Sequence, residues 1–599
     1  MQAANKVALV TLGCAKNEAD SRHMRESIIA SGYELVDKPD CADFIIINTC
    51  AFIQEATEES LEVILSMAEM VPARARRPQL LVVGCLPARY GASLKGELPE
   101  VALFLTPAEE GDIVDGLRSL ASANAESAGE EGVRSLASAN AESEPDPELY
   151  CGPGPEPKPD GGQGPGADPK FGLEQGTEPG SGRENGLGSG SEYGMQGEQK
   201  DTAFQPWAYV KISDGCSRRC SYCTIPQIRG PYQSRPFTAI AAEVSWLIAG
   251  GVWEIILIGQ DTGIWSEPRD RRPIRAVQAN RVAGNVPTDQ PPQPIAQPTA
   301  PTDQPPQPVH SAGPKNLAQL LEALAQTYPA VWFRVLYLQP QGVSDELLAV
   351  MAAHDNICDY LDIPLQHADA RILREMGRSG SAAEHLALIA RARQQIPDVS
   401  VRTTLMAGFP GEDAKAVKTL ERFVREAHCD YVGVFVFSPE PDTIAGQRTD
   451  QLSQRCRQTR AQRLRDLADS ISVQRMADKV GQVIEVMVCG VDEDGMFGRS
   501  QAQAPDVDGV VYINWPVKNT QSPVSAALLA PFPEATTADT LVGNLPVDIT
   551  VSSGAEHPAG TERGSRFAPT TRIPIDLGSR LNVRIYASAG YDLFGELMV

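Results

Sequence analysis

The stretch GCSRRCSYCTIP, residues 215–226, decides the interpretation of this chain, because it places three cysteines in the spacing C-x3-C-x2-C. Cys216, Cys220 and Cys223 can converge on one face of a loop and hold three irons of a cubane iron–sulfur cluster. Such clusters normally take four cysteines, so the missing fourth suggests that a small molecule binds the open iron. Two weaker alternatives are scattered structural thiols and a zinc site, which usually shows two C-x2-C pairs or added histidines.

The block around this loop, about residues 206–478, alternates strand-like and helix-like segments. Expected strands are 208–213, 254–259, 333–338, 360–365, 401–406 and 431–437, and expected helices include 242–250, 317–327, 345–354, 383–394 and 416–428. Six β/α units predict a partial (β/α)6 barrel, whose active site lies at the carboxyl ends of the strands. The cysteine loop follows the first strand, which is the expected place.

Residues 1–120 also predict an α/β fold, with strands at 6–12, 43–49 and 80–84 and helices at 17–31 and 55–70. This βαβαβ pattern is typical of a parallel sheet in a three-layer domain. Each strand ends in a cysteine, namely Cys14, Cys50 or Cys85. Because parallel strands end at one edge of their sheet, the three thiols could meet and hold a second cluster, again without a fourth ligand. Any one of them alone would be interpreted as a buried structural cysteine.

Residues 479–599 contain short strand-like runs at 481–491, 496–500, 510–514, 580–586 and 593–598, which predict a small β-barrel. Between the blocks lie two segments that we expect to be disordered insertions, residues 121–205 and 266–314. The first repeats RSLASANAES and the second repeats PTDQPPQP. A polyproline docking site for a partner is an alternative for these segments. A third irregular stretch, about 516–572, interrupts the C-terminal block.

Composition limits the classes of function. The chain has 599 residues and a formal net charge of −24, and residues 121–205 alone hold 16 acidic and 5 basic side chains. The chain contains no apolar run of 18 residues, so no membrane span is predicted. Its start does not show the pattern of a signal peptide. We therefore expect a cytoplasmic protein without a membrane partner. In a reducing compartment, 12 cysteines indicate metal or redox use and argue against disulfides.

The C-x3-C-x2-C spacing, with Tyr222 just before the last cysteine, resembles the signature of the radical S-adenosylmethionine (SAM) superfamily. The resemblance implies that SAM binds the open iron of a 4Fe-4S cluster and is cleaved to a 5'-deoxyadenosyl radical. It further implies SAM contacts from Tyr222 and from a small set of strand-end residues: Gln260, Asp261, Arg402, Gly408 and Gly411. Two alternatives stay open: a tight strand-to-helix turn for the glycines, and a structural ion pair for Arg402. His367, at the end of a later strand, is interpreted as a core histidine, and no ligand role is assigned to it.

Two incomplete cysteine triads followed by a small β-barrel resemble the radical-SAM methylthiotransferases, and the resemblance covers about 400 residues. It implies a TRAM-like barrel and an auxiliary 4Fe-4S cluster on Cys14, Cys50 and Cys85 that carries the transferred sulfur. It also implies a second SAM as methyl donor and an external electron donor such as flavodoxin or ferredoxin.

One branch of the family modifies a tRNA adenosine, and the other modifies the β-carbon of an aspartate on ribosomal protein S-twelve. TLGCAKNEADS and NTCAFIQEATEESLE resemble the ribosomal-protein branch. A tRNA binder should be basic, whereas residues 480–599 hold 14 acidic and 7 basic side chains, which suits a basic ribosomal protein. Methylthiolation of that aspartate is therefore the leading hypothesis, and tRNA is not expected as a partner. The alternatives are tRNA methylthiolation and a cluster-bearing ribosome-assembly factor without catalysis.

Overall fold

The computed structural model describes residues 5–69, 78–122, 205–268, 313–492, 495–514, 547–551 and 571–598. Contacts divide the chain into one compact unit, Met1–Gly116 with Met195–Val599, and a second, Leu117–Gly194. All elements named here belong to the first unit. The expected insertions at 121–205 and 266–314 lie almost entirely outside the described residues.

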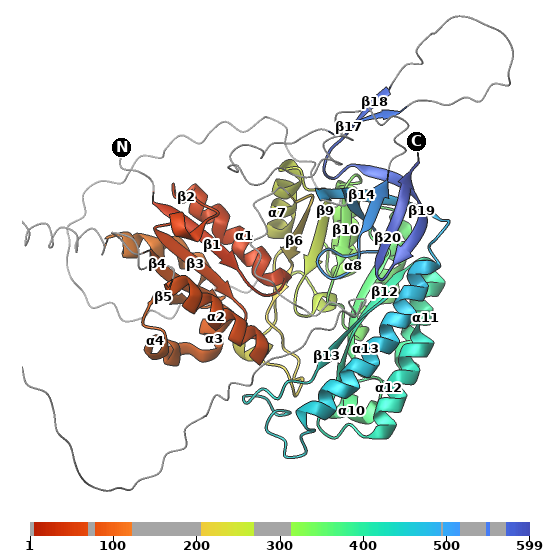
Figure 1. Ribbon diagram of the computed structural model, residues 1–599, viewed down its shortest axis with the longest axis horizontal. Coiled ribbons are helices and arrows are strands. Elements are labelled where there is room, and N and C mark those ends of the chain that lie inside the picture. Colours follow the sequence, from red (N-terminus) through yellow and green to blue (C-terminus); the bar gives the residue numbers. More distant parts are fainter. Residues whose placement is uncertain are drawn as a thin grey trace, which may run out of the picture. The chain divides into compact units, whose positions relative to one another are not determined.

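The N-terminal domain is built on a five-stranded parallel sheet in the order β2-β1-β3-β4-β5 (Figure 1). Its elements are β1 (Lys6–Thr11), α1 (Ala15–Ala30), β2 (Glu34–Leu35), β3 (Phe44–Thr49), α2 (Gln54–Glu69), β4 (Gln79–Gly84), α3 (Cys85–Tyr90), α4 (Leu94–Glu97) and β5 (Val101–Leu105). All six residues of β3 are buried, as expected for a central strand covered on both faces. The parallel βαβ prediction is confirmed, and β2 and β5 extend the sheet beyond the three expected strands.

The central domain holds six parallel strands in two three-stranded sheets, β10-β9-β6 and β11-β12-β13. The strands are β6 (Trp207–Lys211), β9 (Glu254–Ile258), β10 (Trp332–Val335), β11 (Tyr360–Gln366), β12 (Ser400–Ala407) and β13 (Tyr431–Val436). A single parallel bridge, Phe333 to Ile357, links strand β10 to the chain just before β11. The expected partial barrel of six strands is confirmed.

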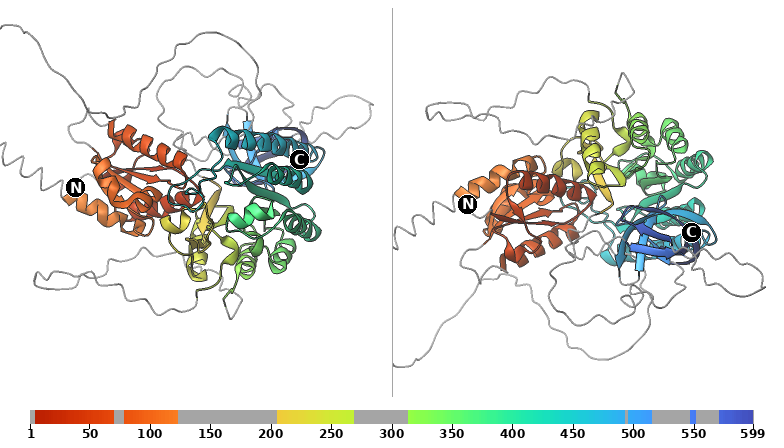
Figure 2. Two further views of the ribbon diagram at one scale, coloured as in Figure 1. Left: turned by 90° about the horizontal axis from the view of Figure 1, so that it is seen from below. Right: turned by 90° about the horizontal axis from the view of Figure 1, so that it is seen from above.

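Helices follow the central strands in the βα alternation that the sequence predicts. They are α6 (Ile225–Ile228), α7 (Phe237–Ala249), α8 (Leu317–Thr327), α9 (Asp345–Ala353), α10 (Ala370–Glu375), α11 (Ala382–Gln395), α12 (Ala414–Ala427) and α13 (Gln454–Ala477). Figure 2 shows α11, α12 and α13 running along the outside of β11–β13. A short ribbon of β7 (Ser213–Asp214) and β8 (Gln233–Ser234) flanks the cysteine loop.

Alternate residues of the central strands serve two different cores. In β9, Ile255 and Leu257 belong to the hydrophobic cluster shared with the surrounding helices. Ile256 and Ile258 point the other way and share a cluster with residues of the C-terminal barrel, such as Val486. This period of two is the geometry of a strand with both faces buried. Part of the inner face of the partial barrel is therefore packed against the C-terminal domain.

The C-terminal domain is a closed barrel of five strands in the order β14-β15-β16-β20-β19, which confirms the expected small β-barrel. The strands are β14 (Val483–Asp492), β15 (Gly495–Ser500), β16 (Val511–Asn514), β19 (Arg580–Ala589) and β20 (Asp592–Leu597). Within the stretch expected to be irregular, β17 (Val547–Val551) pairs antiparallel with β18 (Thr571–Ile575). Within the described ranges, no helix combines the length and the apolar character that crossing a bilayer requires.

Candidate active site

The structure brings Cys14, Cys50 and Cys85 to one edge of the N-terminal sheet. They follow β1, β3 and β4, which are neighbours in the sheet order. Gly13 lies directly against Cys50, since a Cβ at Gly13 would meet the Cys50 Cβ at 2.7 Å. The backbone at Gly13 has a φ of +97°, which favours glycine. A glycine is therefore needed where the end of β1 passes Cys50.

Asn17 holds the ends of β1 and β3 together beside these thiols. Its side-chain amide donates hydrogen bonds to the carbonyls of Leu12 at 2.8 Å and Thr49 at 2.9 Å. Asn48 donates in turn to the Asn17 carbonyl at 2.9 Å. Because buried side chains bonded to two strands fix the relative position of those strands, Asn17 preorganises the loops that carry Cys14 and Cys50.

The N-terminal thiols lie in an environment that suits metal ligation. Burial raises the pKa of Cys50 to about 12 and the pKa of Cys85 to about 11, and the negative charge of Cys14 contributes to raising both pKa values. Cys50 and Cys85 are buried, whereas Cys14 is exposed. A metal takes the place of the thiol proton, so three soft sulfur donors, two of them shielded from water, form a suitable set for an iron–sulfur cluster.

The second triad lies on a loop that is anchored at several points. The Cys216 N–H donates to the Gly230 carbonyl at 3.0 Å, and the Ser221 N–H donates to the Met376 carbonyl at 2.9 Å. Gly215 has a φ of +71°, and a Cβ there would meet the Pro231 carbonyl oxygen at 2.3 Å. Burial raises the pKa of Cys223 to about 12, and Cys220 and Cys216 add to the effect. The three thiols thus share one electrostatic environment.

Within the described part of the chain, no three His, Cys, Asp or Glu side chains converge tightly enough to hold one metal ion. A cubane cluster needs a wider arrangement, because each thiolate binds a different iron. Each triad offers three thiols, and a cubane cluster takes one thiolate on each of three irons.

Gln260 and Asp261 follow β9 and lie beside the second triad. The Gln260 amide donates to Asp214 Oδ1 at 3.1 Å, and Asp261 Oδ2 accepts from Arg218 Nε at 2.5 Å. The other oxygens, Gln260 Oε1 and Asp261 Oδ1, are buried and have no hydrogen-bond partner among the described residues. Buried acceptors without donors are costly, so they fit a ligand that carries hydroxyl or amino groups.

Tyr222 packs against the cluster of Phe409 and Phe437, and its hydroxyl accepts a hydrogen bond from Arg378 at 3.3 Å. Burial raises its pKa well above the usual range. The tyrosine of the cysteine loop is thereby attached to the second half of the barrel. A contact between this ring and SAM stays a prediction.

Gly408 and Gly411 form the turn between β12 and α12, with φ values of +85° and +79°. A Cβ at Gly408 would meet Arg457 Cγ at 2.5 Å, and one at Gly411 would meet Arg448 Nη2 at 3.0 Å. The tight-turn alternative therefore accounts for both glycines, and their contact with SAM stays a prediction.

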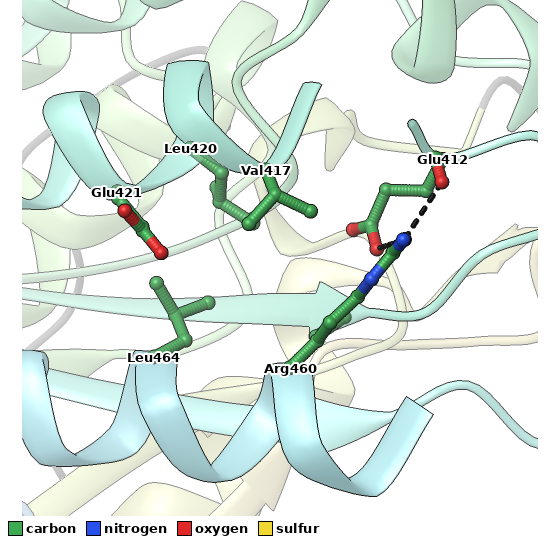
Figure 3. A pocket seen from close by; sticks show the side chains of 7 residues that line it. Glu412, Val417, Leu420, Glu421, Arg460 and Leu464 are labelled. Carbon is green, nitrogen blue, oxygen red and sulfur yellow. Dashed lines mark hydrogen bonds and ion pairs between the residues drawn. The ribbon is translucent and has the colours of Figure 1, made fainter. Parts of the chain in front are cut away.

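The carboxylate of Glu412 holds this turn in place, and Figure 3 shows its contact with Arg460. Its carboxylate accepts from the Gly408 N–H at 3.1 Å and from Arg460 Nη1 at 2.6 Å. The other oxygen lies 3.3 Å from His367 Nε2, which favours the core-histidine alternative for His367. Figure 3 draws the side chains around a small recess beside the Glu412–Arg460 contact, which is lined by Ala407, Glu412, Val417, Leu420, Glu421, Arg460 and Leu464.

Arg402 is buried on β12 between two carboxylates. Its guanidinium lies 3.4 Å from Asp362 of β11 and 3.4 Å from Asp508 of the C-terminal barrel. Tyr360 donates to the other Asp508 oxygen at 2.6 Å. These contacts favour the structural ion pair over the direct SAM contact for Arg402.

Three charged residues that the sequence analysis did not identify connect the two triads. Arg229 Nη2 lies 3.0 Å from Asp20 Oδ2 and 3.8 Å from Cys85 Sγ, and Nη1 lies 3.4 Å from Asp214, two residues before Cys216. Lys211 also pairs with Asp20 and, at 3.4 Å, with Asp214. Asp20 belongs to the motif TLGCAKNEADS, which was the available signal for it. Arg229 thus contacts both cysteine neighbourhoods.

Comparisons with known proteins match all three domains. Residues 6–106 match the uncharacterized protein family UPF0004, residues 210–424 the radical SAM superfamily and residues 480–524 the TRAM domain. The chain is 32% identical to the ribosomal protein uS12 methylthiotransferase RimO of Moorella thermoacetica, over 85% of this chain and 93% of that protein. It is 35% identical to the protein of the same name from Syntrophus aciditrophicus, over 85% and 91%. It is 33% identical to the protein of the same name from Trichlorobacter lovleyi, over 85% of this chain and 92% of that protein.

Proposed function

The chain belongs to the RimO family of ribosomal protein uS12 methylthiotransferases, and we propose that it transfers a methylthio group to the β-carbon of an aspartate of uS12. The observation that carries the proposal is the pair of three-cysteine sites joined by Arg229. One such site supports generation of a radical, and the second supports delivery of sulfur. We propose two 4Fe-4S clusters, one on each triad, and a cytoplasmic enzyme that takes electrons from a flavodoxin or a ferredoxin.

Cofactors of this family supply the radical that removes a hydrogen and the sulfur that replaces it. Cys216, Cys220 and Cys223 would hold the radical-generating cluster, and Cys14, Cys50 and Cys85 the sulfur-bearing one. Gln260 and Asp261 offer buried acceptors for the amino and hydroxyl groups of SAM. Arg229 positions Asp214 beside one triad and Cys85 in the other, and thereby sets the separation between them.

The domain division that accompanies this proposal is 1–120 for the auxiliary-cluster domain, 206–478 for the radical-SAM core and 479–599 for the TRAM-like barrel. The acidic balance of residues 480–599 supports a basic protein substrate and disfavours tRNA, whose phosphates require a basic surface.

The test uses anaerobically reconstituted protein with dithionite, SAM and a peptide that carries the target aspartate. We expect a product heavier by about 46 Da, the mass of CH2S. About eight irons and eight sulfides per chain are expected for two clusters. An unmodified peptide, with 5'-deoxyadenosine still released, would refute the proposed substrate. Tight tRNA binding with a steep salt dependence would favour the other branch of the family.

A further inference from the structure

Lys16 is a buried cation that forms no ion pair with any residue that the structure describes. It lies in the first turn of α1, two residues after Cys14, and is 8% exposed. Its ammonium lies 3.0 Å from the centroid of the Tyr337 ring. Among the described residues, no hydrogen bond or ion pair joins the Lys16 side chain to another group. A buried ammonium is unfavourable unless an anion or hydrogen-bond acceptor reaches it, so the position fits a ligand that carries a negative charge.

The neighbouring cations differ from Lys16, because each already has carboxylate partners. Lys211 pairs with Asp20 and Asp214, and Arg229 pairs with the same two carboxylates. Asp362 is occupied by Arg402 and by the Tyr337 N–H, at 3.4 and 2.9 Å. The carboxylates that act on Lys16, Asp214 and Asp362, are thus bonded to other groups. Among the described residues, the remaining contact of the Lys16 ammonium is the face of the Tyr337 ring.

Tyr337 is held rigidly in the position that meets Lys16. Its φ is +63°, which is unusual for a bulky residue. The Tyr337 N–H donates to Asp362 at 2.9 Å, and its carbonyl accepts from the Thr262 N–H at 3.3 Å. Such strained backbone persists only where surrounding contacts maintain it, and it is concentrated at functional sites. The ring therefore holds the ammonium in a fixed position that is largely shielded from water.

Lys16 lies in the region that both cysteine triads border. Cys14 of the first triad and Asp214, two residues before Cys216 of the second, both act on it electrostatically, as does Arg229. The carbon that accepts the methylthio group has to approach both triads, so it must enter this region. In an aspartate that carbon is bonded directly to the side-chain carboxylate, and an ammonium can hold the carboxylate while leaving the C–H bonds free.

We propose that Lys16 binds the side-chain carboxylate of the target aspartate and so selects an acidic residue over a neutral one. The inference rests on the proposed function. A charge-assisted hydrogen bond of this kind corresponds to an affinity change of about 10- to 100-fold. Tyr337 keeps the ammonium in place until substrate arrives.

The test compares two peptides of the target loop, one with aspartate and one with asparagine at the modified position, by fluorescence anisotropy on the reconstituted protein. Wild type should bind the aspartate peptide about 10- to 100-fold more tightly. Lys16→Met should lose that difference by weakening only the aspartate peptide and raising its KM. Lys95→Met, at an exposed lysine of α4, is the control and should behave as wild type.

The outcomes separate this inference from the proposed function. If wild type binds both peptides equally, or if Lys16→Met keeps the preference, the role of Lys16 is refuted even though the aspartate peptide is modified. If wild type binds but does not modify the aspartate peptide, the proposed function fails, while the binding preference still tests Lys16. The comparison of peptides on wild type requires no variant, so equal binding of the two peptides refutes the inference even if Lys16→Met loads too little iron to be used.

Discussion

Glu254 offers a test of how the C-terminal barrel is attached to the radical-SAM core. It begins β9 and is fully buried. One carboxylate oxygen accepts from Arg334 of β10 at 2.7 Å, and the other accepts from Arg499 of the barrel strand β15 at 2.7 Å. Burial alone would raise the pKa of Glu254, but Arg499 and Arg334 outweigh it and lower the pKa. One carboxylate is thus shared as counter-charge by two buried guanidinium groups from two domains.

Glu254→Gln keeps the shape of the side chain and removes its charge. Arg334 and Arg499 then remain buried without a counter-charge, and removing one partner from a buried ion pair costs about 3–5 kcal/mol. Each guanidinium keeps one hydrogen bond, to the Gln501 carbonyl at 2.8 Å and the Gln503 carbonyl at 3.1 Å. Since those carbonyls carry no full charge, we expect the free energy of unfolding to fall within that range.

Urea denaturation under anaerobic conditions measures this change, and hydrogen exchange of the β14 and β15 amides shows whether the barrel is the part affected. Glu485→Gln is the matched control, because Glu485 is half-exposed and lies 3.9 Å from Arg580. Its expected cost is below about 0.5 kcal/mol. The triple change Glu254→Gln, Arg334→Met and Arg499→Met should be milder than the single one, because it leaves no unpaired charge. A single-variant cost below about 1 kcal/mol, or a costlier triple variant, would refute the reasoning.

Three further changes test the site and the fold. Cys50→Ala and Cys220→Ala should each lower the iron content by about four per chain, whereas Cys41→Ala, at an exposed cysteine, should not; unchanged iron in either triad variant would contradict the ligand assignment. Arg229→Met removes a positive charge and an N–H···S contact from Cys85, so the reduction potential of the N-terminal cluster should fall. A redox titration followed by electron paramagnetic resonance measures the potential, and an unchanged value would count against the role of Arg229. Burial lowers the pKa of His385 from 6.5 to about 4, so the unfolded chain takes up a proton that the folded one excludes, and stability should fall by about 1.5 kcal/mol between pH 6.5 and 5. Urea midpoints at the two pH values measure this, and His385→Gln should flatten the dependence.

The positions of the six cysteines at strand ends could be predicted from the sequence. Cys14, Cys50 and Cys85 follow apolar runs in a βαβ pattern, and a parallel sheet necessarily brings such positions to one edge. Helix α13 was missed because its buried residues form a narrow stripe of mostly small side chains in a segment rich in arginine: Ala461, Leu464, Ala468, Ser472 and Met476. Such a stripe gives little apolar periodicity to detect.

Pairings between distant charges could not be predicted either. Arg229 and Asp20 are separated by 209 positions, and Glu254 and Arg499 by 245. No local pattern encodes such a contact, because it depends on how the domains dock. For Arg402, the sequence left two roles open, and the positions of Asp362 and Asp508 in the folded chain favour the ion pair.

The contact between Arg229 and the N-terminal triad also orders events during biosynthesis. Cys85 and Arg229 are 144 residues apart, and a ribosome adding 5–20 residues per second needs roughly 7–30 s to cover that distance. The N-terminal sheet, complete by Leu105, therefore emerges and can fold well before its basic partner is synthesised. Throughout that interval Asp20 and Cys85 lack the guanidinium that later contacts them. The first triad is thus accessible to the cell's cluster-assembly machinery at a stage when the second does not yet exist.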